Sequence, residues 1–183
     1  MKHTLLTLLF LTTILTSAQY EIKPVEGYSP NIGLIVAMLE DLKVRITDQV
    51  KDLNQAETDF EFDENANSIG ALVMHLISTE AYFEIETLEG RQWSEEEKER
   101  LGFAGGLNEE SKLKLKDKPI QHYLDLWNEV RQKTLAGLKT KDDDWFASEV
   151  DDGMNYHWAW YHVMEHQANH MGQIALVKNR LPK

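Results

Sequence analysis

Three histidines recur at every fourth position in the last third of the chain: His162, His166 and His170. Residues four apart lie on one face of an α-helix, about one turn from each other. Two imidazoles one turn apart can bind one metal ion, since the neutral ring nitrogen is a common ligand of zinc and neighbouring metals. Because the chain has no cysteine, a transition-metal site in it must be built from His, Asp and Glu. The spacing predicts such a site, with an exposed helix face as the alternative.

A fourth histidine, His75, lies in a separate apolar helical segment. Steps of about 100° per residue place His75 on a helix stripe with Ser68, Ala71, Thr79, Tyr82 and Glu86. The same construction places Asn155, Ala159, Gln173 and Val177 with the three later histidines. Both stripes become polar at mid-helix, where a purely structural bundle would carry Leu and Val. We therefore expect a polar pocket between the two helices, although a lone mid-helix histidine can equally be a satisfied core residue.

The elements that would position these residues are predicted to be helices. Apolar residues recur at steps of three and four, and N-cap or proline signals precede the segments. The expected long helices cover residues 30–54, 68–90, 119–138 and 155–180. Ser94 to Glu97 forms a capping box that opens a short acidic helix. With 59–67, 103–118 and 139–153 as polar loops, the pattern predicts an all-α four-helix bundle with long crossover loops.

The N-terminal residues have the pattern of an export signal. A short polar start, an apolar stretch and small residues before Gln19 predict a signal peptide over 1–18, cleaved after Ala18. An uncleaved N-terminal anchor is the alternative. Residues 19–28 would be an extension and 29–183 the bundle domain, so we expect a periplasmic or secreted protein. A net charge of −12 disfavours nucleic acid and, for the mature form, membrane lipid as partners.

The segment from His166 to Ile174, with its His-x-x-x-His-x-Gly-Gln-Ile pattern, resembles the closing signature of the DinB/YfiT-like superfamily. Residues 68–75 resemble the second-helix motif of that family, which ends in its lone histidine. The resemblance implies a four-helix bundle, frequently dimeric, with one divalent ion held by His75, His166 and His170. We expect a homodimer on this ground. Gly172 would then let a neighbouring helix approach closely.

Other polar residues near the two stripes are candidates for supporting roles. His162 is the additional histidine, and we expect it to assist as a hydrogen-bond partner or proton carrier, with a fourth ligand as the alternative. Gln173, Glu165 and Tyr82 could likewise support the ligands or transfer protons. No residue can be assigned a catalytic role from the sequence. Imidazole ligation suits several metals, of which zinc and nickel are the ones we expect first.

Three neutral imidazoles leave open positions on a divalent ion, as is typical of catalytic metal sites. Water on such an ion becomes a nucleophile near neutral pH, which predicts a metal-dependent hydrolase of a small substrate. The resemblance also implies a thiol-dependent transferase, and export argues against it because low-molecular-weight thiols are cytosolic. Two other functions stay open. The protein could bind metal without turnover, or it could be a helical interaction module that uses exposed aromatic residues.

Overall fold

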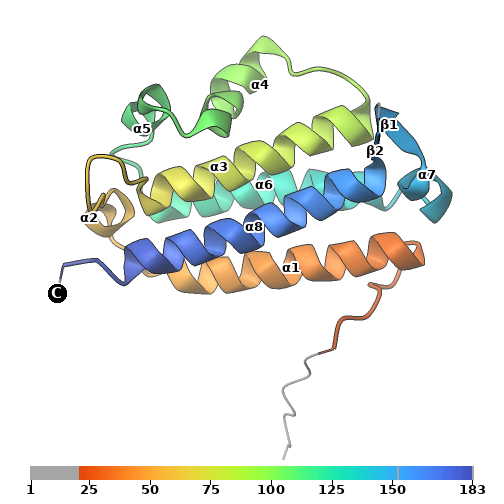
Figure 1. Cartoon of the computed structure of the whole chain (residues 1–183), viewed down its shortest axis with the longest axis horizontal. Helices are drawn as coiled ribbons and strands as arrows, with labels where there is room; N and C mark the ends of the chain where they lie inside the picture. The colour runs from red at the N-terminus through yellow and green to blue at the C-terminus, as the bar shows by residue number, and fades with distance from the viewer. Residues whose placement is uncertain (1–20, 152, 183) are drawn as a thin grey trace, which may run out of the picture.

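The computed structural model describes residues 21–151 and 153–182. The predicted signal peptide and its cleavage site lie outside these residues. Within the described part, four long helices form the bundle: α1 (Pro30–Val50), α3 (Ile69–Phe83), α6 (Ile120–Leu138) and α8 (Tyr156–Lys178) (Figure 1). The prediction of an all-α four-helix bundle is confirmed.

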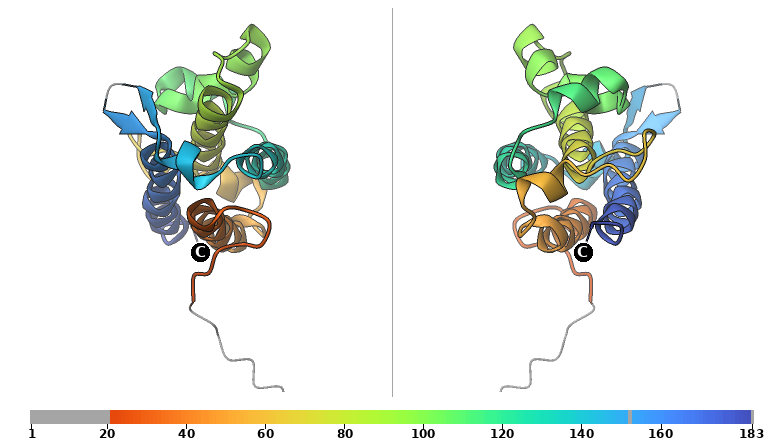
Figure 2. Two further views of the ribbon diagram at one scale, coloured as in Figure 1. Left: turned by 90° about the vertical axis from the view of Figure 1, so that its right-hand side faces the viewer. Right: turned by 90° about the vertical axis from the view of Figure 1, so that its left-hand side faces the viewer.

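The packing of the long helices places α3 beside α8. α3 contacts both α8 and α6, while α1 contacts α8 and α6 from the other side (Figure 2). α3 and α6 run in the same direction, because the crossover that carries α4 (Glu95–Arg100) and α5 (Glu109–Lys114) returns the chain to the starting end of the bundle (Figure 1). The two predicted histidine stripes therefore belong to neighbouring helices.

Side chains at the helix starts fix several boundaries. The Ser68 hydroxyl accepts a hydrogen bond from the Ala71 backbone N–H at 3.2 Å, and the Asn155 side chain accepts one from Trp158 at 2.8 Å. Ser29 directly precedes α1, but its hydroxyl donates to Asp143 at 2.6 Å and does not cap the helix. α3 continues into a π-helix, η1 (Glu84–Glu89), which ends where Gly90 adopts a left-handed conformation at φ 65°.

The connecting segments are more structured than the sequence pattern predicted. α1 ends at Val50, and a short α2 (Gln55–Thr58) follows it. The expected loop 103–118 contains most of a 3₁₀-helix, η2 (Gly102–Gly106), and all of α5. The expected loop 139–153 contains α7 (Asp143–Ala147) and the first strand of a small antiparallel hairpin, β1 (Glu149–Asp151) and β2 (Met154–Asn155). These elements are too short for hydrophobic periodicity to reveal them.

A buried polar group ties the long helices together. Glu80 of α3 and Arg131 of α6 are almost completely buried, at 0% and 1% exposure, and pair at 2.6 Å. Arg131 also donates to the Leu39 carbonyl of α1 at 2.9 Å, and Gln167 of α8 donates to Glu80 at 3.1 Å. All of the long helices thus meet at one ion pair. Among the described residues, none of the helices is long and apolar enough to cross a membrane.

Candidate metal centre

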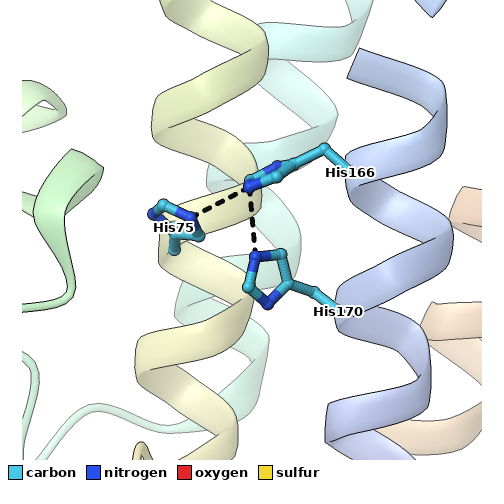
Figure 3. A group of neighbouring side chains, drawn as sticks. All are labelled: His75, His166 and His170. Carbon is cyan, nitrogen blue, oxygen red and sulfur yellow. Dashed lines mark hydrogen bonds between the residues drawn. The ribbon is translucent and has the colours of Figure 1, made fainter. Parts of the chain in front are cut away.

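His75, His166 and His170 converge at the interface of α3 and α8 (Figure 3). The Nε2 atom of His166 lies 3.1 Å from Nε2 of His75 and 3.1 Å from Nε2 of His170. The candidate ligand atoms of the three rings all lie within 4.8 Å of one another. His75 and His170 are buried, and His166 is half-buried. The two segments that the sequence predicted to meet do meet here.

The other ring nitrogens of two of these histidines are held by hydrogen bonds. Nδ1 of His75 lies 2.9 Å from the carbonyl oxygen of Ala104, so this nitrogen must carry the proton and donate it. Nδ1 of His170 lies 3.0 Å from the side-chain oxygen of Gln173. In neutral rings these donations leave the Nε2 lone pairs of His75 and His170 free and aimed at His166.

The geometry fits a metal ion better than a hydrogen-bonded cluster. His166 can carry only one proton on Nε2, so at most one of the two 3.1 Å contacts can be a hydrogen bond. Nitrogens bound to zinc at about 2.0–2.1 Å in tetrahedral geometry would be separated by roughly 3.3 Å. Nδ1 of His166 is buried without a hydrogen-bond partner among the described residues, so no contact there fixes which ring nitrogen carries the proton. The donor set can therefore hold a divalent cation.

The surroundings keep the three rings in the form that binds metals. Burial lowers the pKa of His75 and of His170, and neighbouring histidine charge lowers the pKa of His170 further. The pKa of His166 falls to about 3, first because of burial and then because His170 and His75 lie so close. All three imidazoles are thus neutral at pH 7, which is the protonation state a metal ligand requires.

The other residues that the sequence predicted to support the site lie at different distances from the cluster. Gln173 contacts His170 directly. His162 lies one turn away, with its ring centroid 5.7 Å from that of His166, and is outside the converging set. Its Nδ1 lies 3.0 Å from the exposed carboxylate of Glu165, and its ring stacks on Trp158. Tyr82 is exposed, and its ring is nearly parallel to that of Trp93, with the two centroids 6.4 Å apart.

Two further histidines lie outside the cluster. His122 packs against Tyr123, and His157 stacks on Phe146. The expectation for Gly172 is wrong. A Cβ atom added there would meet nothing within 4 Å, so none of the helices among the described residues approaches it closely.

Sequence reasoning missed two kinds of contact. The Ala104 carbonyl that orients His75 is a backbone group in η2, and no residue type could have signalled it. Gln167, next to His166 in α8, accepts from Arg131 at 3.3 Å as well as donating to Glu80. Burial alone would raise the pKa of Glu80, but the Arg131 charge and its hydrogen bonds hold that pKa below the usual value. Glu80 is thus the ion-pair partner of Arg131 between α3 and α6.

Fold and site together define a class: an all-α bundle with a three-histidine cluster, from two adjacent helices, that could hold a metal ion. The family profile described as mycothiol-S-transferase matches residues 34–182. The chain belongs to this family, which is part of the DinB/YfiT-like superfamily, so the resemblance seen in the sequence is confirmed.

The solved structures add support for the fold alone. A crystal structure titled as the conserved protein of a locus from Enterococcus faecalis has a TM-score of 0.63 and 15% sequence identity to this chain. The alignment covers 80% of this chain and 94% of that one. No curated protein matches the chain.

Proposed function

We propose that the protein is a divalent-metal-dependent S-transferase, which joins a low-molecular-weight thiol to a small electrophile. The observation that carries the proposal is the convergence of three neutral imidazole nitrogens, with Nε2···Nε2 distances of 3.1 Å. Membership of a family described by mycothiol S-transfer supports the choice of thiol as nucleophile. The thiol itself is proposed by class only.

The ligand set suits the binding of an anionic nucleophile. His75, His166 and His170 contribute no negative charge, so the site keeps the full charge of the cation it would hold. A divalent ion bound there would lower the pKa of a thiol placed beside it. In the overall reaction a bond forms between sulfur and an electrophilic carbon, the leaving group departs with its electron pair, and the thiol proton passes to solvent. His162 and its partner Glu165 lie one turn away and are available to accept that proton.

Hydrolysis is the second candidate function, and the export pattern of residues 1–18 favours it. An exported enzyme would not meet the thiols of the cytosol, and the same cation would activate water in place of sulfur. The sites of the two reactions would share His75, His166 and His170. We propose export of the protein together with this second candidate function, and we also propose that the protein is a homodimer. Exposed Trp158 and Tyr161 on α8 offer apolar surface for a second copy.

The first experiment measures metal binding. The purified metal-free protein should take up about one zinc or nickel ion per chain in isothermal titration calorimetry. His170→Ala should lower the affinity at least about 100-fold, because it removes one of the converging nitrogens. His162→Ala is the matched control: it removes the same residue type one turn away and should bind within a few-fold of wild type. Uptake that is equal in all three proteins would refute the ligand assignment.

The second experiment distinguishes the two reactions. The metal-loaded protein is incubated with cysteine or a cysteine derivative and 1-chloro-2,4-dinitrobenzene, and thioether formation is followed by absorbance. We expect a rate above the uncatalysed background that depends on metal and is lost in His170→Ala. Hydrolysis of a nitrophenyl ester without thioether formation would instead favour the second candidate.

A further inference from the structure

A pocket of about 370 Å³ lies beside the histidine cluster, between α3, α4 and η2. Its described lining consists of Ser78, Thr79, Tyr82, Trp93, Lys98, Gly102 and Gly105. The volume is at the small end of the range for ligand pockets, which suits a single ring system and not an extended chain. This pocket is separate from the metal ligands themselves.

Two features place the pocket within reach of the candidate metal site. Thr79 follows His75 by four residues in α3, so it shares the face of His75 and lies about 6 Å further along the helix axis. Gly105 directly follows Ala104, whose carbonyl accepts the hydrogen bond from His75 at 2.9 Å. η2 therefore orients a ligand histidine and forms a wall of the pocket.

The pocket has a flat aromatic side. The rings of Tyr82 and Trp93 are nearly parallel, with an interplanar angle of 25° and centroids 6.4 Å apart. Tyr82 is 44% exposed although it lies on the face of α3 that carries His75. Trp93 packs closely against Gly102, where a Cβ atom would lie 3.5 Å from the indole ring. These roughly parallel rings, of which Tyr82 is exposed and Trp93 half-buried, favour a planar apolar ligand that can stack on them.

The polar groups of the pocket are few. Ser78 is only 3% exposed, yet its hydroxyl makes no hydrogen bond to another residue in the part of the chain that the structure describes. That hydroxyl faces the pocket wall, 3.6 Å from the position of a Cβ atom on Gly105. Lys98 is the cation among the described lining residues, and its ion pair with Glu95 is exposed and therefore weak. An anionic substituent of a ligand could take the place of Glu95.

We propose that this pocket binds the electrophilic substrate, as a planar aromatic molecule with an anionic or hydrogen-bond-accepting substituent directed to Lys98. The substrate's reacting carbon would point toward His75, and its ring would stack on Tyr82 and Trp93. This inference deepens the proposed function and rests on it for the identity of the ligand as a substrate. Binding in the pocket can nevertheless be tested without metal or turnover.

The probe is 1-naphthoate, a planar aromatic anion that cannot react. Isothermal titration calorimetry with metal-free protein should give saturable binding to one site. Gly105→Leu should weaken it at least about tenfold, since the added side chain starts 3.6 Å from Ser78 and Gly105 has no left-handed backbone that would oppose the change. Gly106→Leu is the control, because the neighbouring glycine belongs to the same η2 but does not line the pocket.

A second pair of variants keeps the test decisive if Gly105→Leu fails to fold. Tyr82→Ala alters an exposed side chain and should weaken naphthoate binding about fivefold through loss of stacking. Lys98→Met should remove any preference for 1-naphthoate over the neutral 1-naphthylmethanol. Unchanged naphthoate affinity in Tyr82→Ala, or no binding to wild type, would overturn the proposal.

Failure of this inference can be told apart from failure of the proposed function. Zinc titration of Tyr82→Ala should match that of wild type, because the exposed Tyr82 ring does not contact the converging nitrogens. Naphthoate bound equally by wild type and the folded Gly105→Leu variant would refute the pocket and leave the metal site intact. Zinc uptake that survives His170→Ala would refute the metal site and leave the naphthoate result standing.

Discussion

The three clustered histidines differ in how their second ring nitrogen is held. A backbone carbonyl fixes His75, whereas the Gln173 side chain fixes His170 at 3.0 Å. Hydrogen bonds to the second nitrogen orient a ligand ring and increase its basicity. Gln173 is thus the side chain whose removal tests this contribution without removing a ligand.

Gln173→Ala should weaken zinc binding about tenfold, because His170 would lose the acceptor that fixes its tautomer and ring orientation. Competition with a chromogenic chelator measures the change. Asn169→Ala, an exposed neighbour on the same helix, is the control and should leave the affinity unchanged. An equal affinity for Gln173→Ala and wild type would show that the hydrogen bond to His170 does not tune the site.

Glu84, at the start of η1, carries the clearest prediction on pH. Burial, and then the charge of Glu89, raises the pKa of this carboxyl to about 7. The folded protein therefore binds this proton more tightly than the unfolded chain does. The associated stability is fully present below the ordinary glutamate pKa of about 4.5 and is lost as the pH rises through about 7.

Glu84→Gln should accordingly leave the unfolding free energy nearly unchanged at pH 4.5. At pH 8 it should raise that free energy by about 1 kcal/mol, a value reduced to allow for solvent screening. Urea titrations at the two pH values measure both quantities, with Glu86→Gln on the exposed side of η1 as the control. A variant that is no more stable than wild type at pH 8 would contradict the raised pKa.

At the scale of elements, the long helices could be predicted because their signals are local. Ser68 and Asn155 cap α3 and α8, and Ser94 to Glu97 form the predicted capping box. The meeting of His75 with His166 and His170 followed from helix periodicity together with the family resemblance. Both kinds of information are carried by the residue types themselves.

The crossover elements could not be predicted in the same way. η2 spans only Gly102–Gly106 and contains three glycines, so it offers no apolar period to read. Its contribution to the site is a carbonyl oxygen, which every residue possesses. Gly172 shows the opposite error: a reason was assigned to its missing side chain, and the structure leaves open space there.

At the scale of the whole molecule, the ion pair of Glu80 and Arg131 joins helices that are distant in sequence. Glu80, Arg131, Gln167 and the Leu39 carbonyl come from α3, α6, α8 and α1 respectively. The sequence could not identify this arrangement, because each polar residue sits on an otherwise apolar stripe and its partners become apparent only after folding. Removing either Glu80 or Arg131 would leave the charge of the other buried and unpaired.

Arg131→Met should lower the unfolding free energy by about 3–5 kcal/mol, because Glu80 would be left ionised and buried without its partner. Urea denaturation at pH 7 measures the loss, and Lys133→Met, on the exposed side of α6, should change stability by less than about 0.5 kcal/mol. Combining Arg131→Met with Glu80→Gln should recover part of the loss. A single variant as stable as wild type would show that the pair does not hold the bundle together.

The position of η2 has a consequence for how the proposed activity can diverge. One short stretch of the crossover both contacts His75 and forms one wall of the neighbouring pocket, whose other walls include residues of α3 and α4. The buried ion pair that joins the long helices does not line this pocket. Natural selection can therefore reshape what the protein accepts by exchanging a few crossover residues. The framework that sustains folding would tolerate these exchanges, provided that the carbonyl facing His75 keeps its place.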